Sequence, residues 1–364
     1  MWLVALLVGL LPWSATMAQN HLRVSEIGGF PQSEAGYAMG VSACFAGTIG
    51  NHIIMAGGCN FPDNSGVKRY YKGIYAAYWQ ADTLQWRCIG TLPEPVAYGA
   101  TVDMGDSLLL IGGNNQEHSL RQVVSVKLDP RGNAIVMRLP SLPVTVDNGA
   151  AAYAKGHVFV FGGNQNGKPS KALWSLSCSR PTSQWKSRKA MPGKPRVQPV
   201  CVAHGQRLFA WGGFYAKGAK SKVATDGYAY DVKRNRWAQL AAPRDAAGES
   251  LTLSGATGAT NGAGLLLCLG GVNKTIFADA ISGKYQLVDQ ADYLKQPVAW
   301  YRFNATPLVF NAKTLRWQKP TTPDARLARA GAQLIGIAAN QFLYIGGELK
   351  PGVRTPQILR IELE

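Results

Sequence analysis

The chain contains few of the residues from which metal and redox sites are built. Its 364 residues include five histidines, which are scattered along the sequence, and six cysteines, none of which forms a Cys-x-x-Cys pair. A structural or catalytic metal site is therefore unsupported. The sequence also lacks a phosphate-binding glycine loop and a redox pair of cysteines.

Acidic residues are scarce as well. The 38 Lys and Arg residues outnumber the 21 Asp and Glu residues, which gives a formal net charge of +17. Nucleic acid, an acidic surface and an anionic small substrate could each explain this excess. No dense basic run or aromatic-basic motif occurs, which argues against nucleic acid. An anionic ligand and a simply solubilising surface both stay open.

One apolar segment stands out, at the N-terminus. Residues 1–18 have a centre rich in leucine and valine and end in small residues at Ala15 to Ala18. This pattern predicts a secretory signal peptide, and hence a periplasmic protein without stable membrane insertion after cleavage, although no Lys or Arg precedes the apolar centre. A membrane anchor is the alternative, but the centre is short for a bilayer and Trp13 and Ser14 interrupt it.

Six double glycines recur along the rest of the chain at nearly constant spacing. Their first members are 55, 50, 50, 58 and 76 positions apart, and each pair follows a short apolar run. A repeat near fifty residues is typical of β-propellers, in which each blade buries its faces against its neighbours. The pairs are Gly57-Gly58, Gly112-Gly113, Gly162-Gly163, Gly212-Gly213, Gly270-Gly271 and Gly346-Gly347.

Tryptophan and proline follow the glycines in most units, as in Trp86 with Pro93 and Trp185 with Pro192. This order resembles the kelch repeat, in which the glycines end the second strand of a blade and the tryptophan lies on a later strand. The sequence therefore predicts an all-β, six-bladed kelch-type β-propeller as one domain over residues 19–364, with an insertion at about 272–304.

Cysteine usage leaves the disulfide status open. An even number of cysteines in an exported protein permits disulfides. However, the cysteines fall at similar positions within different units, several of them inside apolar strands, where cysteine commonly acts as a small hydrophobic residue. They are Cys44, Cys59, Cys88, Cys178, Cys201 and Cys268.

The two ends of the chain complement each other. After Gly346-Gly347 only residues 357–363 can form a further strand, so the sixth blade is one strand short. Residues 22–31 resemble residues 86–93, which precede the second inner strand. We therefore predict that the N-terminal strand completes the C-terminal blade and closes the ring, pairing an edge that would otherwise be open.

The loops after the glycine pairs should surround one mouth of such a ring. They are rich in amides and aromatic rings, which suit a polar, ring-shaped ligand. Asn60, Phe61 and Asn273 belong to this set. Asn and Gly are also good turn formers, which is the alternative explanation.

The sixth of these loops carries a carboxylate and a guanidinium. Pro351 and Gly352 are placed for a type II turn that would bring Arg354 back to Glu348. An ideal two-residue hairpin would put these two side chains on opposite faces, so the loop must depart from that geometry if both point inward. The ion pair would keep Glu348 charged and able to accept a proton. An ordinary surface ion pair is the alternative.

The stretch Gly347 to Thr355 reads Gly-Glu-x-Lys-Pro-Gly-x-Arg-Thr. It resembles the active-site loop of the N-acetylneuraminate epimerases, or sialic acid mutarotases, which are exported six-bladed kelch propellers. Residues 97–99, 195–198 and 270–277 are also similar to that family. The loop lies mid-chain in the better-known members, so this chain resembles a cyclically permuted branch. Because the ends of a closed ring lie close together, such a rotation can preserve the site.

The resemblance implies an isomerase that interconverts the α and β anomers of N-acetylneuraminate, a small anionic sugar, without a cofactor or a metal. It implies Glu348 as the proton acceptor and Arg354 as the residue that binds the sugar carboxylate. The sequence does not identify the proton donor to the ring oxygen: a bound water and the returning Glu348 proton both stay open. It does not disclose the oligomeric state either. The expected substrate-binding residues are Asn60, Phe61, Tyr98, Arg196, Gln198 and Asn273.

The insertion at about 272–304 is expected to project over the mouth as a lid or wall, the alternative being an excursion packed on the rim.

A noncatalytic kelch propeller that binds an exported glycan or protein is the main alternative function, because this fold hosts many activities. A copper-radical kelch oxidase is disfavoured by the scattered histidines.

Overall fold

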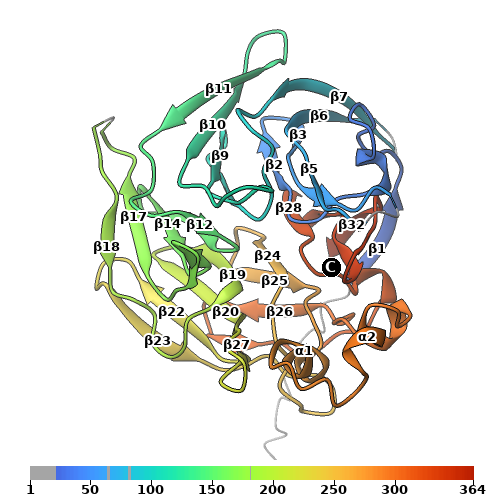
Figure 1. Ribbon diagram of the computed structural model, residues 1–364. Coiled ribbons are helices and arrows are strands. Elements are labelled where there is room, and N and C mark those ends of the chain that lie inside the picture. Colours follow the sequence, from blue (N-terminus) through green and yellow to red (C-terminus); the bar gives the residue numbers. More distant parts are fainter. Residues whose placement is uncertain (1–21, 64–65, 81–82, 181) are drawn as a thin grey trace, which may run out of the picture.

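The computed structural model describes residues 22–63, 66–80, 83–180 and 182–364. The predicted signal peptide at residues 1–18 lies outside these ranges. Within them, six antiparallel sheets have four or more strands each. The prediction of an all-β protein with blade-like sheets is therefore confirmed, and Figure 1 shows the sheets arranged around a common centre.

The first three of these sheets follow one another along the chain. The first sheet contains β2 (Phe45–Ile49), β3 (His52–Ala56), β6 (Gly73–Gln80) and β7 (Thr83–Thr91). The second contains β8 (Ala100–Asp103), β9 (Leu108–Ile111), β10 (Val123–Leu128) and β11 (Ala134–Leu139). The third contains β13 (Ala150–Ala154), β14 (His157–Phe161), β17 (Leu173–Ser177) and β18 (Lys186–Arg188).

The next two sheets continue this order, and the sixth draws on both ends of the chain. The fourth sheet contains β19 (Val197–His204), β20 (Arg207–Tyr215), β22 (Gly227–Asp231) and β23 (Arg236–Leu240), with β21 (Lys222–Val223) added to β20. The fifth contains β24 (Thr257–Thr260), β25 (Leu265–Leu269), β26 (Leu308–Asn311) and β27 (Arg316–Trp317). The sixth contains β28 (Gln333–Ala338), β29 (Gln341–Ile345), β32 (Ile358–Leu363) and β1 (Leu22–Ile27).

The hydrophobic core lies between successive sheets. Strand β9 is buried at every position because sheets cover both of its faces. Leu108 and Leu110 of this strand pack with Ile54 and Ile74 of the preceding sheet in one cluster. A strand that is covered on both faces needs apolar residues at every position, which explains the unbroken apolar run in the second strand of each unit.

The double glycines join each unit to the next. Gly57 and Gly58 have φ angles of 59° and 100°, a region that side chains rarely adopt. A Cβ atom on Gly57 would lie 2.4 Å from the carbonyl oxygen of Val96, and the Gly58 N–H donates to that same oxygen at 2.8 Å. In the last unit the Gly347 N–H donates to the Val41 carbonyl at 2.9 Å, so the sixth pair contacts the beginning of the first unit.

A second set of equivalent residues lies at or just before the start of each inner strand. All six have positive φ, and each donates its N–H to the carbonyl of the one before it, at 2.7 to 3.1 Å. The last of these hydrogen bonds returns from Ala43 to Gly331. We call this set the axial residues: Ala43, Tyr98, Asn148, Gln198, Gly255 and Gly331.

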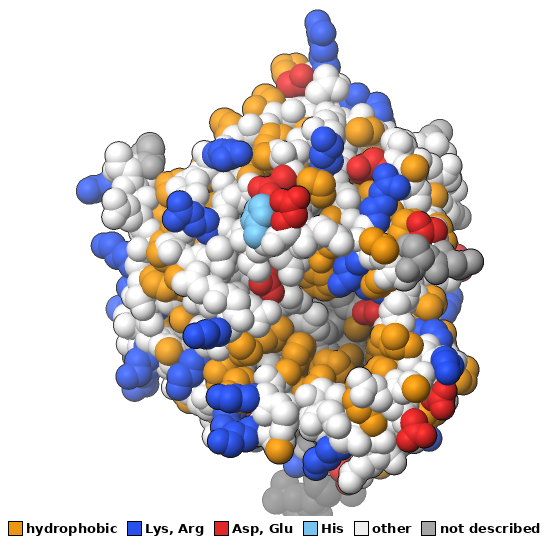
Figure 2. Space-filling model, viewed as in Figure 1, with side chains coloured by type: hydrophobic (Ala, Val, Ile, Leu, Met, Phe, Trp, Pro, Cys, Tyr) orange, Lys and Arg blue, Asp and Glu red, His pale blue; other side chains and the backbone are white. Residues whose placement is uncertain are grey.

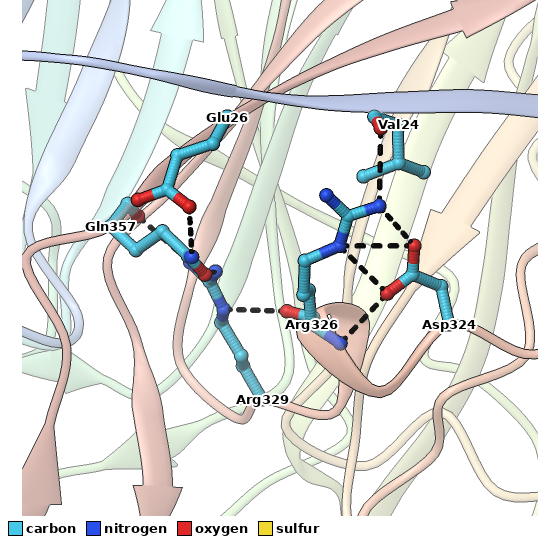
Figure 3. A network of polar contacts seen from close by, with 6 residues as sticks. All are labelled: Val24, Glu26, Asp324, Arg326, Arg329 and Gln357. Carbon is cyan, nitrogen blue, oxygen red and sulfur yellow. Dashed lines mark hydrogen bonds and ion pairs between the residues drawn. The ribbon is translucent and has the colours of Figure 1, made fainter.

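The first and last described strands share one sheet. Strand β1 pairs antiparallel with β32, with Leu22 opposite Leu363 and Ile27 opposite Ile358. Side chains reinforce this pairing: Arg326 Nη2 donates to the Val24 carbonyl at 3.1 Å, and Gln357 Nε2 donates to Glu26 Oε2 at 2.8 Å. Figure 3 shows both contacts beneath the β1 ribbon.

Small hairpins and short helices occupy the loops. The hairpins pair β4 (Cys59–Asn60) with β5 (Arg69–Tyr70), β15 (Asn164–Gln165) with β16 (Lys168–Pro169), and β30 (Glu348–Lys350) with β31 (Val353–Arg354). Strand β12 (Val146–Asp147) adds to β15 as a third strand. The helices are α1 (Lys274–Ile281), α2 (Gln290–Tyr293) and the 3-10 turns η1 (Tyr37–Met39), η2 (Val298–Tyr301) and η3 (Ala325–Leu327). No helix in the described ranges is long and apolar enough to cross a membrane. All six cysteines are free in the structure.

Candidate active site

The hairpin β30–β31 brings the predicted carboxylate and guanidinium to the same face. Glu348 pairs directly with Arg354, and Lys350 pairs with Val353, because the register shifts by one residue between Glu348 and Lys350. Cross-strand partners project to the same side, so this bulge supplies the departure from ideal hairpin geometry that the sequence required. Gly352 has φ 88°, as the second central residue of a type II turn should.

One oxygen of Glu348 is fixed and the other is not. Glu348 Oε1 accepts hydrogen bonds from Arg354 Nη1 at 2.8 Å and from the Gly352 N–H at 2.9 Å. Within the described part of the chain, no group donates a hydrogen bond to Oε2, and the side chain is 23% exposed. The carboxylate is thus oriented through one oxygen while the other can receive a proton.

Arg354 is nearly enclosed, with 4% of its side chain exposed. Its Nε donates to Ser42 Oγ at 2.9 Å, and the Phe61 ring covers the guanidinium at 5.0 Å from Cζ. Burial alone would lower the pKa of Arg354, but Glu348 and Tyr98 raise it above its ordinary value. The guanidinium is therefore a permanent positive charge in a partly dry site, which suits a planar carboxylate.

Tyr98 is a further neighbour of this arginine and raises its pKa. It is one of the axial residues, with φ 59°, a backbone strain of about 1–3 kcal/mol that is commonly kept at functional sites. Lys68 Nζ donates to Tyr98 Oη at 3.2 Å. Burial and Cys59 raise the pKa of Tyr98 well above its ordinary value, against a smaller lowering by Arg354.

A cavity of about 420 Å³ runs along the axis, lined by the axial residues and by the inner strands β2, β8, β13, β19, β24 and β28. Tyr98 and Gln198 line it, whereas Glu348 and Arg354 belong to the loops outside its lining. Gln198 Nε2 donates to Asn148 Oδ1 at 2.8 Å, so its amide nitrogen is engaged by a neighbouring axial residue. The face in Figure 2 is hollowed near its centre, with Lys and Arg side chains scattered around the periphery.

Three predicted substrate-binding residues are engaged by the protein instead. Asn60 is buried, donates to the Gly36 and Gly40 carbonyls, and accepts from Tyr71. Asn273 caps α1, accepting hydrogen bonds from two backbone N–H groups of its first turn.

Arg196 is the third of these residues. Its guanidinium binds the Gly212 and Asp226 carbonyls and the Asp226 carboxylate at 2.7 Å, and it covers the Tyr228 ring. These three side chains thus hold the loops around the site through contacts within the protein, and their contact with a ligand stays a prediction.

The insertion packs against the hairpin of Glu348. Lys350 Nζ donates to the Leu294 and Gln296 carbonyls at 3.1 and 2.7 Å. Burial, Tyr301 and Tyr285, and then Glu348, raise the pKa of Tyr293 to about 12. The segment around Leu294 and Gln296 thus lies beside the hairpin that carries Glu348.

Sequence reasoning missed three side chains. Ser42 accepts a hydrogen bond from Arg354, and Lys68 donates one to Tyr98. Asp147 is buried and accepts hydrogen bonds from Ser119, Asn148 and Asn164, at the mouth of the third unit. Ser42 and Asp147 directly precede axial residues, so aligning the six repeats would have identified both. Lys68 lies in a long loop without a motif, and no sequence signal marks it.

These features define a class: an all-β protein of repeated four-stranded sheets whose loops present an ion-paired carboxylate, a buried arginine and a phenol on one face. Among the described residues, no group of three or more His, Cys, Asp or Glu side chains could hold a metal ion.

Comparison with known proteins identifies the family. The sequence model of the family described as N-acetylneuraminate epimerase matches residues 12–136 and 139–364. The chain belongs to the N-acetylneuraminate epimerase family.

Individual relatives agree with this assignment. The chain is similar to the N-acetylneuraminate epimerase of Yersinia enterocolitica, with 30% identity over 234 residues that cover 61% of this chain and 56% of that protein. It is also similar to that of Salmonella paratyphi B, with 29% identity over 251 residues that cover 65% of this chain and 61% of that protein. The match thus spans less than two thirds of the length of these relatives.

Proposed function

We propose that the protein is an N-acetylneuraminate epimerase that interconverts the α and β anomers of this sugar. The observation that carries the proposal is the pairing of Glu348 with Arg354 across a bulged hairpin, with Glu348 Oε2 free of hydrogen bonds from the described residues. An oriented base beside a buried cation is the minimum that ring opening of an acidic sugar requires.

The reaction needs one base and one acid. The base removes the proton from the hydroxyl on the anomeric carbon C2 while the ring oxygen O6 is protonated, the C2–O6 bond breaks, and an open-chain ketone forms. Reclosure on the opposite face gives the other anomer. We assign the base to Glu348, through Oε2.

Arg354 binds the carboxylate attached to the anomeric carbon in this proposal. Charge-assisted hydrogen bonds between a guanidinium and a carboxylate are strong and directional, so they fix the position of C2 next to Glu348. Phe61 and the rings of the insertion limit access of water, which strengthens these interactions. Lys68 and the net charge of +17 favour the approach of an anion.

We further propose a closed, six-bladed kelch-type propeller over residues 19–364, completed by the N-terminal strand and carrying an insertion at about 272–304. The pairing of β1 with β32 and the hydrogen bonds among the axial residues support this architecture. Export to the periplasm by a signal peptide at residues 1–18 is part of the same proposal.

The direct test follows the anomers by proton NMR. α-N-Acetylneuraminate, freshly released from a glycoside, is mixed with the protein, and the approach to the anomeric equilibrium is compared with the spontaneous rate. We expect acceleration in proportion to protein concentration. Binding of the sugar without acceleration would instead indicate a noncatalytic propeller and reject the epimerase proposal.

A further inference from the structure

Tyr98 is a second group with an exchangeable proton beside Arg354. It stands at one of the six axial positions, and no other axial position carries an aromatic side chain. The remaining axial residues are Ala43, Asn148, Gln198, Gly255 and Gly331. A left-handed backbone is unfavourable for a bulky residue, so retaining a phenol at this one point of the repeat indicates a role beyond packing.

Lys68 holds the hydroxyl of this phenol. Its Nζ donates to Tyr98 Oη at 3.2 Å and lies 5.0 Å from the centre of the Tyr98 ring. It also lies 5.8 Å from the centre of the Phe61 ring, which covers Arg354. Because an ammonium group only donates, the hydroxyl oxygen of Tyr98 is the acceptor in this contact, and its O–H faces a different neighbour.

Tyr98 and Glu348 both adjoin the same guanidinium. Arg354 Nε donates to Ser42, and the Tyr98 N–H donates at 3.0 Å to the carbonyl of the next residue, Ala43. In agreement with this geometry, Arg354 lowers the pKa of Tyr98, and Tyr98 raises that of Arg354. Burial is the largest influence and raises the pKa of Tyr98 well above its ordinary value, which keeps the phenol protonated at neutral pH. A carboxylate that can accept a proton and a phenol that can donate one therefore adjoin one carboxylate-binding arginine.

We infer that Tyr98 is the acid that donates a proton to the ring oxygen, and that Lys68 is a positioning residue that stabilises the phenolate formed in that step. The inference rests on the proposed epimerase function. With the sugar carboxylate on Arg354, C2 lies next to the guanidinium, and both the hydroxyl oxygen and O6 are bonded to C2. Groups that adjoin the arginine can therefore reach one oxygen each.

The step balances without an oxidant or a cofactor. Glu348 takes the proton of the anomeric hydroxyl, the electrons of that O–H bond form the C2=O double bond, and the electrons of the C2–O6 bond pass to O6. O6 takes the proton of Tyr98, leaving a phenolate beside Lys68. On reclosure, O6 attacks the other face of C2 and returns its proton to Tyr98, while Glu348 returns its proton to the C2 oxygen.

Two measurements on the full chain separate chemistry from binding. The anomer exchange rate at saturating N-acetylneuraminate gives kcat, and calorimetric titration with its methyl glycoside, which cannot open, gives Kd. For Tyr98→Phe we expect kcat to fall about 10²- to 10³-fold while Kd changes less than about threefold. Lys68→Met should lower kcat about tenfold, and Lys68→Arg should restore most of that loss.

Tyr70→Phe is the matched control. Lys68 Nζ lies 5.9 Å from the centre of the Tyr70 ring, but it does not donate a hydrogen bond to the Tyr70 hydroxyl. Removing that hydroxyl should therefore leave kcat within about twofold of the parent. Equal losses in Tyr70→Phe and Tyr98→Phe would overturn the inference, as would an unchanged kcat in Tyr98→Phe. An inactive parent protein would instead reject the epimerase proposal itself, so the two failures are distinguishable.

Discussion

Two buried arginines of the C-terminal unit make opposite uses of the same side chain. Arg329 is 1% exposed and Arg354 has 4% of its side chain exposed. Arg329 donates to the carbonyls of Gly346, Gln357 and Arg326. Arg354 donates to a carboxylate and a hydroxyl at the hairpin β30–β31. One arginine satisfies backbone groups, and the other adjoins ionisable side chains.

The pKa values of the two arginines shift in opposite directions because their partners differ. Burial lowers the pKa of Arg329, and nearby acidic groups do not compensate fully. The pKa of Arg354 is raised in spite of burial, because Glu348 and Tyr98 favour its charge. The comparison indicates that Arg329 holds the sheet that both chain ends share, as Figure 3 shows through Gln357 and Glu26. Arg354 is instead the residue that we propose to bind the carboxylate of the substrate.

The largest effect is expected from the partner of Arg354. Glu348→Gln keeps the acceptor for Arg354 and Gly352 but removes the base, so kcat for anomer exchange should fall about 10²- to 10⁴-fold. The thermal midpoint should stay close to that of the parent. A variant that exchanges anomers at the parent rate would show that Glu348 is not the base.

Arg329→Met should act on folding rather than on chemistry. It leaves several buried carbonyls without donors, so the free energy of unfolding should fall by about 2–4 kcal/mol in urea titrations. The folded fraction should retain the parent kcat. If stability is unchanged and activity is lost, the two arginines do not divide their roles in this way.

Arg354→Met makes the matched substitution at the site. Losing one charge-assisted contact with the sugar carboxylate should raise KM about 10- to 100-fold. Because Glu348 keeps the Gly352 N–H and contact with solvent, the free energy of unfolding should change by less than about 1 kcal/mol. A KM equal to that of the parent contradicts carboxylate binding by Arg354.

The smallest effect concerns the shared sheet. Hydrogen bonding by Arg326 holds the pKa of Asp324 below its ordinary value. The stabilisation by this pair is therefore complete above the unfolded-state pKa of about 4 and disappears as the pH falls through the folded-state value. Asp324→Asn should remove that part of the acid sensitivity, worth less than about 1 kcal/mol, in unfolding curves between about pH 5 and pH 2. An unchanged acid sensitivity would mean that the contact does not stabilise the sheet.

The sequence predicted the repeats and the pair of Glu348 and Arg354 because both depend on local signals. The double glycines mark positive φ angles, and Pro351-Gly352 specifies the turn between the two side chains. No residue type in the loop marks the bulge after Glu348, which places the two side chains on the same face.

The partners of other side chains could not be predicted because they are distant in sequence. The sequence places Asn60 at the mouth, and its amide donates to the carbonyls of Gly36 and Gly40. Arg196 pairs with Asp226, thirty positions away. Residue type predicted hydrogen-bonding capacity at these sites, but only the packed sheets decide whether the fold or a ligand uses it.

The most direct measurement is a crystal structure with the methyl glycoside of N-acetylneuraminate. We expect the sugar carboxylate to lie within hydrogen-bond distance of the Arg354 guanidinium and the glycosidic oxygen on C2 to lie next to Glu348 Oε2. A sugar bound elsewhere, or with its carboxylate turned away from Arg354, would contradict the roles proposed for both residues.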